Sequence, residues 1–220
     1  MRVKNTAIEW ETGLAQQFDD LPQQHEAATL GMWVFLATEI LMFGGLFTAY
    51  TAYRATYPHA FEVGSEHLYR WIGVGNTAVL LLSSLFVALA VHAIKHGDNR
   101  ACARDLVIAA ALGVLFLGLK GIEYTLDIRD GLLPWYHFHP EGANEAATKL
   151  FLVFYWFMTG LHAVHVTIGI VLLLFFAALC RRGEYDTEWH NPIEMVGLYW
   201  HFVDIVWIFL LPTLYLIKPG

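Results

Sequence analysis

The feature that most constrains this chain is a series of five long apolar stretches, at about residues 31–53, 71–94, 104–126, 149–180 and 194–217. Each has the roughly 20 residues that an α-helix needs to cross about 30 Å of hydrocarbon. Of the 220 residues, 57% are hydrophobic and 15% are charged, so the chain is far more apolar than a soluble domain. Backbone groups in lipid must be hydrogen-bonded internally, and the stretches lack the alternation of a β-barrel. The sequence therefore predicts an all-α, polytopic membrane bundle of five transmembrane helices over residues 31–217.

The polar residues outside these stretches predict the orientation of the chain. Residues 1–30 form a polar tail that is unlike a cleaved signal peptide, which starts with a short basic segment. Seven lysines and arginines fall on the side of this tail and five on the opposite side. By the positive-inside rule, we expect the N-terminus in the cytoplasm and the C-terminus outside. Cys102 and Cys180 would then lie on the reducing side, where a structural disulfide is not expected.

The net charge of −7 bears on the partners of the chain. An acidic balance argues against nucleic acid as a partner, because nucleic acid is bound by basic surfaces. It argues equally against a polybasic patch on the lipid surface.

Five ionisable side chains fall near the middle of the predicted helices: Glu39, His162, His165, His201 and Asp204. The two residues of each pair, His162/His165 and His201/Asp204, are three positions apart and so share one helix face. A charge at mid-membrane costs at least about 2.5–3.5 kcal/mol, so these groups should face the bundle interior and one another. Two interpretations stay open: a structural hydrogen-bond network, or groups that move protons or hold a ligand.

Small residues near the same depth indicate close helix packing. Gly44, Gly45, Gly160 and Gly169 would allow neighbouring backbones to approach, as membrane interfaces prefer.

The sequence offers few candidate ligands for a metal centre. A di-iron bundle needs Glu-x-x-His pairs on two helices, and none falls inside the five stretches. His137 and His139 form an H-x-H in the 127–147 loop, with only Glu141 close by and no neighbouring cysteine. The sequence therefore predicts no metal site and no catalytic residue.

The histidines and the helix pattern bear on two other functional classes, a membrane haem protein and a secondary transporter. A membrane haem protein needs histidines on facing helices, which His162 or His165 opposite His201 could supply. A secondary transporter would show inverted repeats and broken helices, and no such repeat is visible in five segments. The haem protein stays open as an alternative, and the transporter is disfavoured.

Several spaced motifs give the chain a resemblance to subunit III of the haem-copper respiratory oxidases, in its five-helix form, from about Leu30 to Ile217. The C-terminal motif is similar to the family's H-x3-E-x6-H-F-x-D-x-V-W pattern, here His190, Glu194, His201, Phe202, Asp204, Val206 and Trp207. Residues 159–166, TGLHAVHV, resemble a second family segment, and Glu123-Tyr124 resembles the family's EY pair. Glu39 falls at the place of a family carboxylate that is known to react with hydrophobic carbodiimides.

The resemblance implies an accessory, non-catalytic subunit of a proton-pumping terminal oxidase in aerobic electron transport. Such a subunit binds phospholipid but no haem or copper, which belong to partner subunits. It packs against subunit I, in a complex that includes subunit II, and it supports proton uptake. His190 and Glu194 are then expected to bind lipid or to form an inner-side polar group. The resemblance further implies a bacterial-type inner membrane and leaves a subunit associated with nitric oxide reductase as an alternative.

The chain also departs from the longer members of this family. Those have seven helices, with a lipid-filled cleft between the first two and the other five, whereas this chain resembles the five alone. Its 127–147 loop is longer than expected for the seven-helix form. Whether a lipid cleft persists without the two extra helices is therefore a question for the structure.

Overall fold

Five membrane-length helices and one short helix make up the computed structural model, which describes residues 17–18, 20–66, 68–133, 144–185 and 190–217. The long helices are α2 (Leu21–Thr56), α4 (Arg70–Lys95), α5 (Asn99–Arg129), α6 (Glu145–Arg182) and α7 (Asn191–Tyr215), and α3 (Pro58–Glu66) is short. Each long helix is long and apolar enough to cross a membrane. The all-α fold and the five spanning helices are thus confirmed. The chain is an integral membrane protein.

The first helix begins earlier than expected, at Leu21 rather than near residue 31. The Asp20 carboxylate caps it by accepting a hydrogen bond of 2.8 Å from the Gln23 backbone N–H, and Pro22 occupies the first turn. Hydropathy alone missed this start because the first turns contain Gln, His and Glu side chains. At about 1.5 Å per residue, the 36-residue helix is about 54 Å long, so it extends beyond the hydrocarbon layer.

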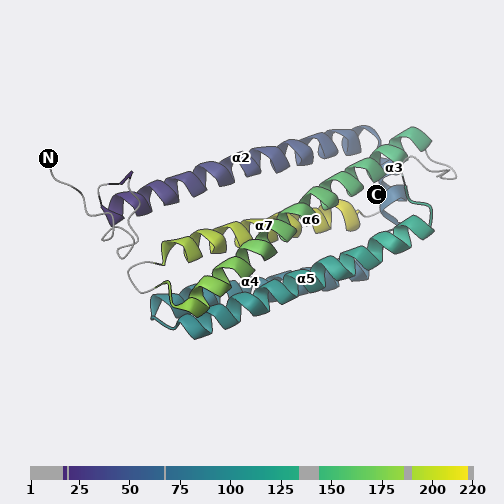
Figure 1. Ribbon diagram of the computed structural model, residues 1–220. Helices are drawn as coiled ribbons and strands as arrows, with labels where there is room; N and C mark the ends of the chain where they lie inside the picture. Colours follow the sequence, from purple (N-terminus) through teal and green to yellow (C-terminus); the bar gives the residue numbers. More distant parts are fainter. Residues whose placement is uncertain (1–16, 19, 67, 134–143, 186–189, 218–220) are drawn as a thin grey trace.

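Four of the long helices form a closed bundle, and α2 lies beside it. In Figure 1, α4 and α5 run together along one side, α6 and α7 lie in the middle, and α2 (purple) runs along the opposite side. α7 packs against α4 and α6 and is the most buried helix, while α2 is the least buried. The end of the bundle where α2, α5 and α7 begin is called the proximal end below, and the opposite end the distal end.

The centre of the bundle is occupied by the Trp200 indole of α7, which is fully buried. Its Nε1–H donates a 3.1 Å hydrogen bond to Ser83 Oγ of α4, and Ser83 Oγ donates in turn to the Ala109 carbonyl of α5 at 2.9 Å. The indole also lies directly against Gly113 of α5 and Gly169 of α6. One side chain therefore contacts all three neighbouring helices of the bundle.

The glycines named from the sequence do not all serve close packing. A Cβ atom added to Gly169 would lie 2.7 Å from Trp200 carbons, so this position must lack a side chain. Around Gly44, Gly45 and Gly160, by contrast, no atom of the described residues lies within 4 Å of an added Cβ. The expectation of close packing within the chain is correct for Gly169 and wrong for the other three.

α2 is fixed to the bundle by few contacts. At the distal end, the Tyr50 hydroxyl donates a 2.7 Å hydrogen bond to the Thr213 carbonyl in the last turn of α7, which has no helical partner of its own. The same tyrosine packs against Phe61 of α3 and Phe154 of α6. Toward the proximal end, α2 exposes large apolar side chains such as Trp33 and Leu41. The helix is thus packed most closely at the distal end, and Leu36 and Phe43 are the residues that it buries further toward the proximal end.

The short helix α3 was not anticipated from the sequence. It follows α2 directly at the distal end and buries Ala60, Phe61 and Gly64 against the bundle. The Phe151 ring of α6 takes the space that a Cβ on Gly64 would fill. α3 therefore covers the distal ends of α2 and α6.

We predict that Gly169→Ala destabilises the protein while Gly160→Ala does not. The added methyl group at 169 must displace the buried Trp200 ring, and overpacking of this kind costs about 1–3 kcal/mol. Thermal unfolding of the purified protein in detergent measures the difference. Equal melting temperatures for the two variants would contradict the proposed packing of Trp200.

Candidate functional site

The sequence-predicted polar residues are distributed over three separate places in the bundle. Glu39 of α2 and His165 of α6 form one pair, with Glu39 Oε2 and His165 Nε2 3.0 Å apart. His201 and Asp204 lie between α7 and α4, and His162 is enclosed among α5, α6 and α7. The shared depth of the five residues does not make them one cluster, because they face different neighbours.

The hydrogen bonds of His165 define what the Glu39–His165 pair can do. Its Nδ1 lies 2.8 Å from the Leu161 carbonyl, which can only accept, so Nδ1 carries a proton. Nε2 and Glu39 Oε2 then share one further proton between them. It resides either on the carboxyl group of a neutral pair or on the imidazolium of an ion pair. In both states the pair has no net charge, which makes it tolerable at mid-membrane.

This pair lies in the wall of a groove between α2, α6 and α7. The groove has a volume of about 360 Å³ and is otherwise lined by apolar and aromatic side chains: Met32, Phe35, Ile168, Leu172, Val196 and Tyr199. The side chains of Glu39 and His165 keep 15% and 11% of their surface exposed. Tyr199 donates a 3.1 Å hydrogen bond to the His165 carbonyl and so supports the wall from α7. An exchangeable proton therefore sits beside an apolar cavity.

The His201–Asp204 segment faces α4. His201 Nδ1 lies 2.6 Å from the hydroxyl of Ser84, a partner that hydropathy did not single out. The Asp204 side chain is buried, and Ser84 lies beside its carboxylate as well. The histidine and aspartate share a helix face as expected, and Ser84 of α4 faces both.

A second groove, of about 320 Å³, connects His201 with the proximal end of α4 and α7. Lys95 of α4 and Glu194 of α7 form an ion pair of 2.7 Å at its mouth, and His190 lies 3.5 Å from the same carboxylate oxygen. Between this ion pair and His201, the groove is lined by apolar residues: Ala88, Val91, Gly197 and Leu198. His190 and Glu194 are therefore brought together, as an ionic group at the proximal end.

His162 occupies an aromatic enclosure. Its ring stacks on Trp207 with a centroid distance of 5.3 Å and meets the edge of Phe116 at 5.7 Å. Neither ring nitrogen has a hydrogen-bond partner among the described residues. The ring is enclosed by these neighbours, while His201 is bonded to Ser84 on another face, so the two histidines do not form a facing pair.

The most extensive buried polar network was not predicted from the sequence. Its centre is Lys120 of α5, which is 2% exposed. The ammonium donates to Glu123 Oε2 at 3.1 Å, to the Tyr155 hydroxyl at 3.1 Å and to the Tyr215 hydroxyl. All three N–H bonds of the lysine are thereby used.

The two tyrosines pass these hydrogen bonds on to carboxylates. Tyr155 donates to Asp127 Oδ2 at 2.6 Å, and Tyr215 donates to Glu123 Oε1 at 2.6 Å. The ammonium also lies 4.7 Å and 5.2 Å from the centres of these two rings, within cation–π range. The network therefore joins α5, α6 and α7 in the distal half of the bundle. Only Glu123 was singled out before, although Lys120, Glu123 and Asp127 share one helix face by their spacing.

Metal ligands do not gather in the described part of the chain: no group of three or more His, Cys, Asp or Glu side chains there could hold an ion. His137 and His139 lie outside the described residues. Cys102 of α5 and Cys180 of α6 are buried, unbridged thiols with their sulfur atoms 3.3 Å apart.

This geometry defines a class of protein: a membrane-spanning helical bundle with paired polar groups and lateral grooves. The sequence pattern of one family, cytochrome c oxidase subunit III, matches residues 22–218. A cytochrome c oxidase subunit 3 of Thermostichus vulcanus is 35% identical over 206 residues, which cover 93% of this chain and 94% of the relative. A quinol oxidase subunit 3 of Bacillus subtilis is 29% identical over 210 residues, 90% and 94% of the two chains.

The match over nearly the whole chain settles the family. The chain belongs to the cytochrome c oxidase subunit III family, and it is an accessory subunit of a haem-copper oxidase in aerobic electron transport. The expected resemblance is thus confirmed. Since the relatives are named as oxidase subunits, a subunit of nitric oxide reductase is not favoured, and a stand-alone haem protein is disfavoured by the separate settings of His162 and His201.

We predict that Lys120→Met strongly destabilises the protein. The substitution leaves Glu123 and Asp127 buried without their cation, and breaking a buried ion pair from one side costs about 3–5 kcal/mol. Lys149→Met is the matched control, because Lys149 pairs with Glu145 at a more exposed position. Thermal unfolding in detergent compares the two. A loss of stability no larger for Lys120→Met than for the control would show that the network is not structural.

Proposed function

We propose that the subunit stabilises the catalytic subunit I from the side, binds phospholipid and supports proton uptake. The observation that carries the proposal is the Glu39–His165 pair, which shares one proton at the edge of an apolar groove. In this proposal the chain itself holds no catalytic centre. Haem and copper are bound by partner subunits, with subunit II as a further member of the complex.

The apolar groove beside Glu39 supports the lipid-binding part of the proposal. Its lining offers aromatic and branched side chains of the kind that pack against acyl chains. α2 is the least buried of the spanning helices, and the groove opens to the surface between it, α6 and α7. An ordered lipid there would fill the space between α2 and α7. It would make this side of the subunit more rigid, as in a packed protein core.

The grooves and ionic groups of the proximal end support the role in proton uptake. In the orientation expected from the positive-inside rule, this end faces the cytoplasm. The Lys95–Glu194 pair would collect protons from that side, and the second groove leads from it to His201. The membrane would be a bacterial-type inner membrane.

We predict that a hydrophobic carbodiimide labels Glu39 in the wild-type protein. The reagent partitions into lipid, and Glu39 is a carboxyl group bordering an apolar groove that reaches the surface. Peptide mapping by mass spectrometry should show the adduct at Glu39. Glu39→Gln should abolish it, whereas Glu194→Gln, at the aqueous end, should keep it. Undiminished labelling of Glu39→Gln would place the reactive group elsewhere.

We also predict that an oxidase complex lacking this subunit starts turnover normally and then inactivates sooner. The haem spectrum should be unchanged, because the cofactors belong to other subunits. Proton uptake should slow more as the pH rises, since the proximal ionic groups no longer supply protons. Oxygen consumption over time at two pH values, with and without the subunit, measures this. Equal rates and equal lifetimes would leave only an assembly role, and a lost haem signal would indicate a cofactor-binding chain.

A further inference from the structure

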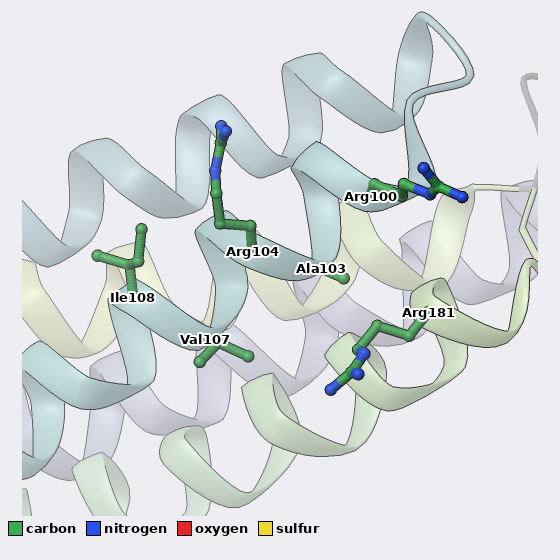
Figure 2. Close-up of a pocket in the computed structure, with 6 residues that line it drawn as sticks. All are labelled: Arg100, Ala103, Arg104, Val107, Ile108 and Arg181. Carbon is green, nitrogen blue, oxygen red and sulfur yellow. The ribbon is translucent and has the colours of Figure 1, made fainter.

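A third groove, between α5 and α6 at the proximal end, is unrelated to the Glu39 pair. It has a volume of about 590 Å³ and is lined by Arg100, Ala103, Arg104, Val107, Ile108 and Arg181. Figure 2 shows Arg100 and Arg104 extending from successive turns of α5, and Arg181 on the facing helix α6. These three side chains line one cavity, but their guanidinium groups point in different directions, and that of Arg104 extends away from α6. The acidic balance of the whole chain gave no indication of such a basic patch.

The positive charge of this groove is poorly compensated from within. Within the described residues, neither Arg100 nor Arg181 makes an ion pair. Arg104 donates from Nε to the Asp105 carboxylate at 2.8 Å, which leaves the terminal nitrogens of its guanidinium available. Among the described residues, the carboxylates of Asp105 and Asp98 both act on Arg104, so the cations of the groove without an ion pair are Arg100 and Arg181. Guanidinium groups bind phosphate oxygens through paired N–H bonds, so a phosphate is the complementary anion.

The residues that line the groove lie at two depths, which match the headgroup and the acyl chains of a lipid. α5 begins at Asn99 and α6 ends at Arg182, so the arginines lie where the spanning helices leave the hydrocarbon. Val107 lies seven residues beyond Arg100, which is about 10 Å further along the helix. Val107 is 43% exposed and borders the same groove. A free phosphate ion would use only the arginines, whereas a phospholipid would use the apolar half as well.

We propose that this groove binds an anionic phospholipid. Arg100 of α5 and Arg181 of α6, whose long side chains are exposed, turn toward the headgroup phosphate at the membrane surface, and the acyl chains run along Val107 and Ile108 between α5 and α6. The phosphate of such a headgroup keeps its negative charge, whereas a zwitterionic headgroup also carries an ammonium that neutralises the phosphate and is repelled by the arginines. Because the site lies between α5 and α6, it is separate from the groove of Glu39 between α2, α6 and α7.

The test uses the purified complex in detergent, stripped of bound lipid and then supplied with one probe at a time. Phosphatidylglycerol is the anionic probe, phosphatidylcholine the zwitterionic probe and inorganic phosphate the free anion. Native mass spectrometry gives the apparent affinity for each. We expect a preference of about tenfold or more for phosphatidylglycerol over phosphatidylcholine, and no competition by millimolar phosphate.

Variants assign the effect to the groove. Arg100→Gln with Arg181→Gln should weaken phosphatidylglycerol binding about 25-fold, since each arginine near a lipid surface contributes about fivefold. Arg182→Gln is the matched control, because Arg182 is the next residue, lies 3.9 Å from Glu184 and does not line the groove. Arg100→Gln alone, an exposed position in the first turn of α5, should act in the same direction if the double variant does not accumulate.

Several outcomes would overturn the proposal. Equal binding of the two lipids, an equal loss in the Arg182→Gln control, or full competition by inorganic phosphate would each exclude a specific anionic-lipid site. Glu39→Gln should leave the preference for phosphatidylglycerol unchanged. A failure at the arginines is therefore distinguishable from a failure of the lipid role proposed for the Glu39 groove.

Discussion

The packing of the four-helix bundle depends on the contacts of one indole ring. Trp200 can lie at the bundle centre only because Gly113 and Gly169 leave space for it on two neighbouring helices. Its N–H is satisfied by Ser83, whose own proton is bonded to a backbone carbonyl of α5. In lipid there is no hydrophobic force between helices, so fit and hydrogen bonding must provide the association energy. The Trp200 contacts supply both, and the positions of the neighbouring polar residues follow from them.

Two kinds of buried polar group result from this arrangement. The Lys120 network is closed: every proton of the ammonium has an acceptor, and the phenols direct their own protons to carboxylates. Such a network holds three helices in one geometry. The Glu39–His165 pair is open: it is partly exposed in a groove and has two arrangements of one proton. The first suits a structural role, and the second suits exchange with the surroundings.

The sequence predicted those parts of the structure that depend on composition and local spacing. The five spanning helices follow from apolar length. His190 and Glu194 were named from the resemblance to the family, and their contact with each other was not predicted. The partner of Glu39 could not be chosen between His162 and His165, because that choice depends on which face of α6 meets α2. The start of α2 was missed because its first turns are polar. Lys120 was missed although its spacing from Glu123 and Asp127 was visible in the sequence, whereas its tyrosine partners, on α6 and α7, could not be identified from spacing.

The sparse attachment of α2 has a consequence for how the protein is made. Of the five spanning helices, α2 is synthesised first, yet two of the polar groups that it contacts, His165 and the Thr213 carbonyl, belong to the last two helices. Until α6 has been inserted, Glu39 must reside in the bilayer without its partner. A charged side chain at mid-membrane costs about 2.5–3.5 kcal/mol during insertion, and the apolar residues of α2 itself have to offset that cost. The exposed Trp33, Leu41 and their neighbours therefore serve biogenesis first: they keep α2 in the membrane while the ribosome completes the helices that will receive it.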